Sequence, residues 1–540
     1  MQVKWILVGW RPHVALSLLC ALLFLPGIAA LPPTDRDEAR FMQATKQMLE
    51  TGDVVSIRFQ WDLRTKKPVG IHWLQYASVK YLAGRDTGAV WAYRLPSLVA
   101  AWLAVLACFA FGRRLFDTET ALFGAALLAS TFILTVEAHL AKTDAALLLT
   151  VVAAQSYLYR LYAAGPDERP HLGVTLGFWV AVGAGLIIKG PVTLGVAGLT
   201  AAALCLADRR INWLRGLQPE IGIPVAAAFI LPWSLASAAA GNGDVLTASV
   251  MEDLIPKLIG GAEGHGAPPG LHTLVSPLTL WPASLFILPG IIVAWHRRAE
   301  PAIRFLLAWG GASWLLFELV PTKLPHYVLP AVPALCLAAA AALRVDIQLP
   351  RWTRGLTTVT SLALGAGMVW AAQTYDGPVG LAGTGLLVCF LFTAAVWLRP
   401  QWHRAAIPVT AVAAFAMLAG GVLPRLDALA LSPRLRDTIA DYAHPTAIPV
   451  ALARYHEPSA VFWLGTETLL TGARNAAAHV SADPDALAVI APDQLDIVSD
   501  LVDAFGGSLV VLSQIDGYNY AKGREESLIL IRSEPEPAVP

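Results

Sequence analysis

The chain has 540 residues, of which 56% are hydrophobic and only 14% are charged, and its mean hydropathy is +0.57. This composition excludes an ordinary soluble protein of this length and predicts an α-helical protein that crosses a membrane many times. Lysine plus arginine and aspartate plus glutamate both number 39, so the net charge gives no indication of a nucleic-acid partner. The five cysteines form no CxxC pair, which argues against a disulfide framework or a thiolate metal site.

The apolar segments predict about thirteen membrane-spanning helices within residues 1–423. The first resembles a secretory signal, but the many later spans favour a retained helix over a cleaved one. Around Lys189, Gly190 and Pro191, one long apolar run is either two helices or one kinked helix. The spans are expected near residues 12–31, 91–111, 119–136, 141–162, 172–189, 190–206, 220–240, 273–294, 302–320, 325–344, 354–372, 379–397 and 405–423.

Lysine and arginine accumulate in every second loop, for example at Arg113 and Arg114, and this pattern predicts that those loops and the N-terminus are cytoplasmic. An odd number of spans then places residues 32–90 and residues 424–540 on the opposite side of the membrane.

The loop at residues 32–90 is expected to contain two amphipathic helices that lie in the membrane interface. Thr34 fits a helix N-cap, Phe41, Met42 and Met48 recur on one helical face, and Gly52 would end the first helix. Pro68 would open the second.

Residues 424–540 are richer in charge and predict a small soluble α/β domain on that same side. Buried strands are expected at 459–465, 486–492, 508–514 and 527–533, and a helix at 491–507.

Charged residues of both signs occur at membrane edges on the predicted non-cytoplasmic side, and they indicate a site for an anionic ligand. The positive-inside pattern gives no reason for lysines there, so Lys142, Lys189 and Lys323 are candidates, together with Asp144 and His326. Lys142 and Asp144 fit a simple ion pair equally well.

Asp37 and Glu38 fall in the first turn of the first interfacial helix, where a carboxylate is favoured for structural reasons alone. The alternative role is that of a general base in catalysis. Lys67, at a helix entry, either stays solvated or binds a ligand. His265 lies in a loop rich in glycine and proline and is a candidate metal ligand, although no strong ligand motif surrounds it.

Several short motifs follow one another in an order seen in one group of enzymes. The chain resembles bacterial membrane glycosyltransferases of the GT-C fold, in the family of aminoarabinose and dolichyl-phosphate-mannose-type transferases, over roughly residues 10–345. The motifs are DEAR at 37–40, KP at 67–68, YRLPS at 93–97, KTD at 142–144, IIKGP at 187–191, LPW at 231–233 and TKLPHYVLP at 322–330.

The resemblance implies transfer of a single sugar, with inversion, from a polyprenyl (undecaprenyl) phosphate donor to a lipid, glycan or protein acceptor on the periplasmic side of the bacterial inner membrane. It implies a catalytic role for Asp37 and its neighbour Glu38, and donor-phosphate binding by Arg40, Lys67, Lys189 and Lys323. Some relatives have a metal-binding glutamate where this chain has Lys66, so the need for a divalent metal stays open.

Two other classes of function remain open at this point. A transporter or flippase for a lipid-linked anionic substrate would also need lysines at membrane depth, but such proteins often show duplicated halves, and the sequence contains no evident internal repeat. A structural or assembly subunit would require neither Lys189 nor Lys323.

Overall fold

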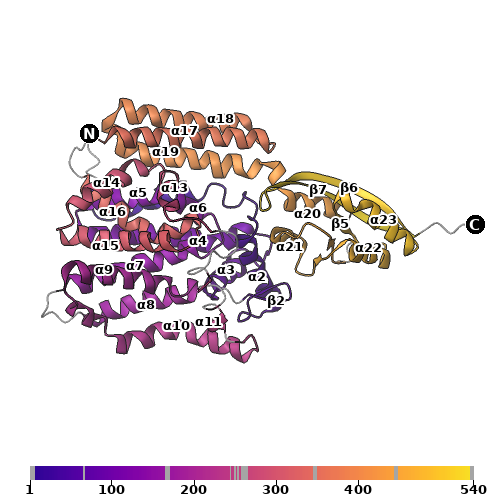
Figure 1. The fold of residues 1–540 in the computed structure, drawn as a ribbon, viewed down its shortest axis with the longest axis horizontal. Helices are drawn as coiled ribbons and strands as arrows, with labels where there is room; N and C mark the ends of the chain where they lie inside the picture. The colour runs from indigo at the N-terminus through magenta and orange to yellow at the C-terminus, as the bar shows by residue number, and fades with distance from the viewer. Residues whose placement is uncertain are drawn as a thin grey trace, which may run out of the picture.

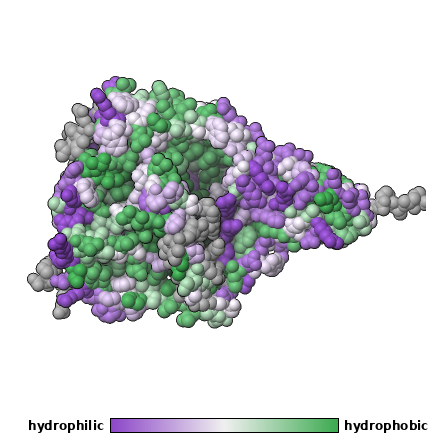
Figure 2. Space-filling model, in the orientation of Figure 1, coloured by the Kyte–Doolittle hydropathy of each residue, from purple (hydrophilic) through white to green (hydrophobic). Residues whose placement is uncertain are grey.

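The computed structural model describes residues 6–64, 67–164, 171–243, 245–248, 251, 255–256, 266–343, 349–442 and 448–535. Long helices lie side by side in a helical body, and a separate C-terminal domain sits at the end of that body which carries α2 and α3 (Figure 1). Hydrophobic residues cover much of the helical body, whereas the C-terminal domain is mostly hydrophilic (Figure 2). This distribution is expected for a multi-pass membrane protein with one domain outside the bilayer.

The first half of the helical body contains α1 (Arg11–Phe24), α2 (Asp37–Thr51), α3 (Gly70–Leu82), α4 (Val90–Leu115), α5 (Thr118–Ala129), α6 (Phe132–Ala138), α7 (Asp144–Ala163), α8 (Leu172–Lys189), α9 (Val192–Asp208) and α10 (Pro219–Ala239), with a short β-hairpin of β1 (Arg58–Phe59) and β2 (Asp62–Leu63). The second half contains α11 (Val245–Ala248), α13 (Leu271–Thr279), α14 (Ser284–His296), α15 (Pro301–Leu319), the 3₁₀ helix η5 (Pro325–Ala331), α16 (Val332–Ala342), α17 (Arg351–Thr374), α18 (Val379–Leu398) and α19 (His403–Met417).

Among the described residues, eight helices are long and apolar enough to cross a membrane. The pair α5 and α6, bent by 63°, would make a ninth span, and the shorter apolar helices α1, α9 and α14 coincide with three further predicted spans. The predicted number of about thirteen therefore exceeds what helix length and hydropathy support. One reason is that breaks divide some apolar runs, as between α13 and α14.

The apolar run around Lys189 forms two helices. Gly190 ends α8 with a φ of +71°, a conformation that glycine adopts without strain, and Pro191 is the N-cap of α9. Lys189 is consequently the last residue of α8, and the nearby Ile187 lies against Gly70 of α3.

Helix α2 differs from the predicted interfacial helix. It starts after Arg36, and its N-cap makes no side-chain hydrogen bond, so the prediction that Thr34 caps it is wrong. Gly52 ends it as predicted, with a φ of 76°. Phe41 packs into the main core of the helical body, while Met42 packs with Phe462 of the C-terminal domain. Because both faces are covered, α2 is held between the two parts of the molecule.

The C-terminal domain is a five-stranded mixed sheet in the order β4-β3-β5-β7-β6, with helices on both faces. Leu528 and Leu530 of β7 face a core shared with α20, whereas Ile529 and Ile531 face α22 and α23, as the alternation of a strand requires. Its elements are α20 (Leu431–Tyr442), β3 (Ala451–Leu452), α21 (Pro458–Leu464), β4 (Leu469–Leu470), α22 (Ala473–Ala482), β5 (Ala488–Ile490), α23 (Leu495–Ala504), β6 (Gly507–Asn519) and β7 (Arg524–Pro535).

The strands predicted at 486–492, 508–514 and 527–533 correspond to β5, β6 and β7, and the predicted helix corresponds to α23. The strand predicted at 459–465 is wrong, because these residues form α21. Pro458 opens this helix and Gly465, with a φ of 118°, ends it. A short apolar run does not by itself distinguish a buried strand from a buried helical turn.

Gly70 is the point of closest approach between α3 and the end of α8. A Cβ built there would lie 2.5 Å from the backbone oxygen of Ile187. We therefore expect Gly70→Ala to force the two helices apart and to lower stability by about 1–3 kcal/mol. Thermal unfolding in detergent measures this loss. Gly195→Ala in α9 is the control, since no atom lies within 4 Å of its added methyl group. Equal melting temperatures for the two variants would contradict the close approach.

Candidate functional site

The carboxylate of Glu38 is the most completely bonded group near the start of α2. Arg94 of α4 donates from Nε to Oε1 at 2.8 Å and from Nη2 to Oε2 at 3.1 Å. Oε1 also accepts from the backbone N–H of Ala141 at 2.9 Å, and Oε2 accepts from the N–H and the hydroxyl of Thr34 at 2.8 and 2.9 Å. Arg94 further donates to the backbone oxygens of residues 28, 31 and 32.

This arrangement assigns Glu38 a structural role. Burial alone would raise the pKa of Glu38, but the charge and hydrogen bonds of Arg94, with the two backbone N–H donors, lower it below its usual value. Both oxygens are occupied and the residue is only 1% exposed, so a substrate cannot reach it. The prediction that Glu38 shares the catalytic role is not supported by this geometry. Arg94, the partner of Glu38, lies inside a predicted apolar span, and a charged residue in such a span could have indicated this ion pair from the sequence.

Asp37, the adjacent residue and the first of α2, is exposed. Its carboxylate interacts electrostatically with Lys142. Arg40 is also exposed, one turn further along α2. Asp37 therefore faces away from the Glu38–Arg94 pair and remains accessible from outside the helical body.

Beside Asp37, five ionisable side chains from distant parts of the chain form one cluster, which we call the ionic cluster: Glu137, Lys142, Asp144, Lys189 and His326. Lys142 Nζ lies 3.4 Å from Glu137 Oε1, and Lys189 Nζ lies 2.5 Å from Asp144 Oδ1. His326 joins the two pairs, because its Nδ1 is 3.6 Å from Glu137 and its Nε2 is 3.8 Å from Asp144. The ring of Tyr327 covers the ammonium group of Lys189 at 5.8 Å.

Four structural elements bring the ionic cluster together. Glu137 lies near the end of α6, Lys142 in the α6–α7 turn, Asp144 at the start of α7, and Lys189 at the end of α8. His326 comes from η5. Four of the five residues were predicted from the sequence, and Glu137 was not. A single carboxylate within the apolar segment ILTVEAHL could have indicated it.

Lys323 lies outside the ionic cluster. Its ammonium group donates to the backbone oxygens of Phe317, Glu318 and Val320, so it caps the C-terminal end of α15. With three carbonyl acceptors already bound, Lys323 does not fit the predicted role of a phosphate ligand.

Lys67 is half-buried just before α3. Among the described residues, no group of three or more His, Cys, Asp or Glu side chains has a metal-binding arrangement. The metal candidate His265 lies outside the described residues.

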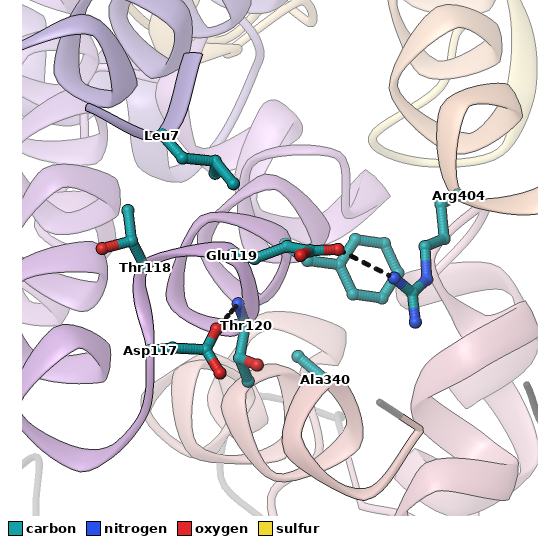
Figure 3. A pocket seen from close by; sticks show the side chains of 8 residues that line it. Leu7, Asp117, Thr118, Glu119, Thr120, Ala340 and Arg404 are labelled. Atoms are coloured by element: carbon teal, nitrogen blue, oxygen red, sulfur yellow. Dashed lines mark hydrogen bonds and ion pairs between the residues drawn. The ribbon is translucent and has the colours of Figure 1, made fainter. Parts of the chain in front are cut away.

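A cavity of about 520 Å³ lies far from this cluster, between α5, α16 and α19 (Figure 3). An ion pair between Glu119 and Arg404 crosses it, and Asp117 caps α5 beside it. Helix α4 connects the two regions, with Arg94 near its start and its last residue just before α5. Its 26 residues span about 39 Å, so the cavity belongs to the opposite end of the helical body.

The chain is similar to known membrane glycosyltransferases both in sequence and in fold. Residues 66–235 match the family model of the dolichyl-phosphate-mannose-protein mannosyltransferases. The fold is that of ArnT from Cupriavidus metallidurans in its crystal structure bound to undecaprenyl phosphate, with a TM-score of 0.73 and 17% identity over 96% of this chain and 97% of that one. The chain is a relative of these membrane transferases, as its motifs predicted.

The curated relatives match a smaller part of this chain than the ArnT structure does. The undecaprenyl phosphate-α-4-amino-4-deoxy-L-arabinose arabinosyl transferase of Pseudomonas paraeruginosa is 30% identical over 308 residues, which are 57% of this chain and 55% of that protein. The corresponding transferase of Pseudomonas aeruginosa strain PAO1 is 28% identical over 338 residues, 61% and 60% of the two chains. The matched region thus spans less than two thirds of each relative's length.

Replacing Arg94 tests the structural assignment of Glu38. Arg94→Met leaves the buried Glu38 carboxylate without its positively charged partner and three backbone oxygens without their arginine donor, and we expect a loss of about 3–5 kcal/mol in stability. The control is Arg454→Met, which removes one partner of the exposed pair with Asp493 and should cost at most about 1 kcal/mol. Thermal unfolding of the two purified variants gives the comparison. Similar losses of stability in both variants would mean that the Glu38–Arg94 pair stabilises the fold no more than an exposed ion pair does.

Proposed function

We propose that this protein transfers one sugar from an undecaprenyl-type polyprenyl phosphate to a lipid, glycan or protein acceptor, on the side of the membrane that carries the C-terminal domain. The observation that carries the proposal is the ionic cluster beside the exposed Asp37. It joins two lysines and a histidine at one end of the helical body, in a fold shared with a protein that binds undecaprenyl phosphate.

The charge balance of the reaction explains why such a cluster is useful. A sugar joined to polyprenyl phosphate is a phosphodiester with one negative charge, and the departing polyprenyl phosphate acquires a second. Cations that lie close to this phosphate stabilise the transition state more than the bound donor, and therefore accelerate the reaction. Lys189 and Lys142 are held in the ionic cluster by Asp144 and Glu137, which also offset their charge before a donor binds.

Asp37 is suited to the second task. It accepts the proton of the acceptor hydroxyl as that oxygen forms a bond to the anomeric carbon, while the bond from this carbon to the phosphate oxygen breaks on the opposite face. The products are a glycoside of inverted configuration, polyprenyl phosphate and protonated Asp37. The Asp37 carboxylate is exposed, so an acceptor can reach it, and the ion pair of the next residue, Glu38, keeps its helix in a fixed position.

The proposed orientation places the N-terminus in the cytoplasm and the C-terminal domain in the periplasm of a bacterial inner membrane. The alternation of positively charged loops supports it, and so does the position of α2 and α3 on the same side as the C-terminal domain (Figure 1).

Mass spectrometry of lipids and glycans from cells with wild type, a deletion or a point variant at equal expression tests the function. Loss of the same single-sugar mass increment from one molecule in the deletion and in Asp37→Asn supports transfer and identifies the acceptor. If surface lipids change in the deletion but Asp37→Asn behaves as wild type, transport of a lipid-linked substrate becomes the better explanation.

Asp37→Asn should reduce transfer by about 10²–10⁴-fold, because the amide cannot accept the hydroxyl proton. The change is isosteric and the side chain is exposed, so we expect the melting temperature to stay the same. Asp62→Asn removes another exposed carboxylate from the same loop and is the matched control. Comparable transfer by the two variants would remove Asp37 as the base.

Lys189→Met should weaken binding of undecaprenyl phosphate by about tenfold or more, because a charge-assisted contact with the phosphate is lost. Lys189→Arg keeps the charge and should retain most of the affinity. Lys323→Met is the control: it should lower the melting temperature, since the cap of α15 is lost, without a specific loss of affinity. Titration of each purified variant with undecaprenyl phosphate provides the measurement, and equal loss in the two methionine variants would contradict the assignment.

A further inference from the structure

The C-terminal domain binds the chain directly before Asp37, at two consecutive residues. The phenolic oxygen of Tyr520 accepts a hydrogen bond from the backbone N–H of Asp35 at 2.7 Å. The guanidinium group of Arg36 donates to the backbone oxygen of Ala521. On the other side, the carboxylate of Asp35 accepts from the backbone N–H of Ser459, at the start of α21, at 3.1 Å. Tyr520 and Ala521 form part of the turn between β6 and β7.

The backbone at this point needs an external constraint. Arg36 has a φ of 68° and a ψ of −104°, outside the conformations that a residue with a side chain usually adopts. Such a conformation costs free energy and persists where neighbouring contacts hold it. Because Arg36 immediately precedes Asp37, a change in its dihedral angles would rotate the first turn of α2 and move the Asp37 carboxylate.

The β6–β7 turn is itself fixed to the helical body at a second place. The ring of Tyr518 contacts that of Tyr375, which follows α17, at 5.2 Å between centroids. Arg434 of α20 donates to the backbone oxygen of Asp516 at 2.8 Å. Asn519 bonds to Glu457 at 2.9 Å, and Lys522 lies 3.4 Å from the same carboxylate. The turn therefore connects the α17 side of the helical body to the segment before α2.

We infer that the C-terminal domain positions Asp37 for the proposed transfer, with Tyr520 and Asp35 as positioning residues that hold the strained Arg36 backbone. This inference rests on the proposed function. It gives the domain a direct part in the reaction, although none of its residues named here touches a reacting atom. Partial burial of Asp35 and the nearby charge of Glu457 raise the pKa of Asp35 to about 6, and hydrogen bonds from Ser459 and Tyr520 partly offset this rise.

Tyr520→Phe is the central experiment, because it removes one oxygen atom and keeps the ring. We expect transfer, measured as the single-sugar mass increment in cells at equal expression, to fall by about five- to tenfold, as the loss of one hydrogen bond predicts. Binding of undecaprenyl phosphate to the purified full chain and its melting temperature should remain those of the control. That control is Tyr442→Phe, which removes a hydroxyl that donates to the backbone oxygen of Leu512 within the same domain.

Asp35 supplies a conservative pair. Asp35→Asn keeps an oxygen that accepts from the backbone N–H of Ser459 and removes only the half-buried negative charge, so it should retain most of the transfer that Asp35→Ala loses. A general structural role would instead lower melting temperature and undecaprenyl phosphate binding together with transfer. That result in Tyr520→Phe would overturn the inference.

The same set of measurements separates this inference from the proposed function. If Asp37→Asn abolishes the mass increment while Tyr520→Phe equals Tyr442→Phe, the positioning role is wrong and the transferase function stands. If Asp37→Asn transfers as well as wild type, the proposed base fails, and the positioning role fails with it. A selective loss of transfer in Tyr520→Phe and in Asp35→Ala, with Asp37→Asn inactive, supports both.

Discussion

The buried ion pair between Glu38 and Arg94 is the constraint on which the arrangement of this end of the molecule depends. Arg94 binds the carboxylate and three backbone oxygens of the preceding loop, and Glu38 in turn binds the turn at Ala141. One pair thereby joins α4, the start of α2 and the segment that carries Lys142. Breaking it would leave charge buried without a partner, which is far more costly than loss of an exposed pair.

Asp37 and the ionic cluster are neighbours as a result. The pair fixes the first turn of α2 against the helical body, and the C-terminal domain binds Asp35 and Arg36 just before that turn. Within the cluster, each lysine is balanced by a carboxylate, and His326 lies between the two pairs. In the proposed function, a donor phosphate would compete with these carboxylates for the lysines, because phosphate and carboxylate oxygens both accept charge-assisted hydrogen bonds.

Much of the fold was predictable from the sequence, because apolar length and strand alternation are local signals. The strands β5, β6 and β7 follow from such patterns, whereas the apolar run at Gly190 was compatible with two helices or with one kinked helix. The exceptions have physical reasons. SAVFWLG forms a helix because Pro458 and Gly465 bound it, and among the described residues only eight or nine of the about thirteen predicted spans meet the length and hydropathy expected of a membrane helix, partly because breaks divide apolar runs.

The sequence by itself determined that this is a multi-pass membrane protein with ionisable residues on one side, because the cost of burying charge in a bilayer makes such residues conspicuous. It also located Asp37, Lys189 and Asp144 as candidates. Only the tertiary structure decided which partners they meet. Asp37 and Glu38 are adjacent in the chain, but helical geometry turns one outward and the other toward Arg94, 56 residues away. Likewise Lys189 meets Asp144 while Lys323 caps α15, because partners distant in sequence are brought together by packing, which no local pattern encodes.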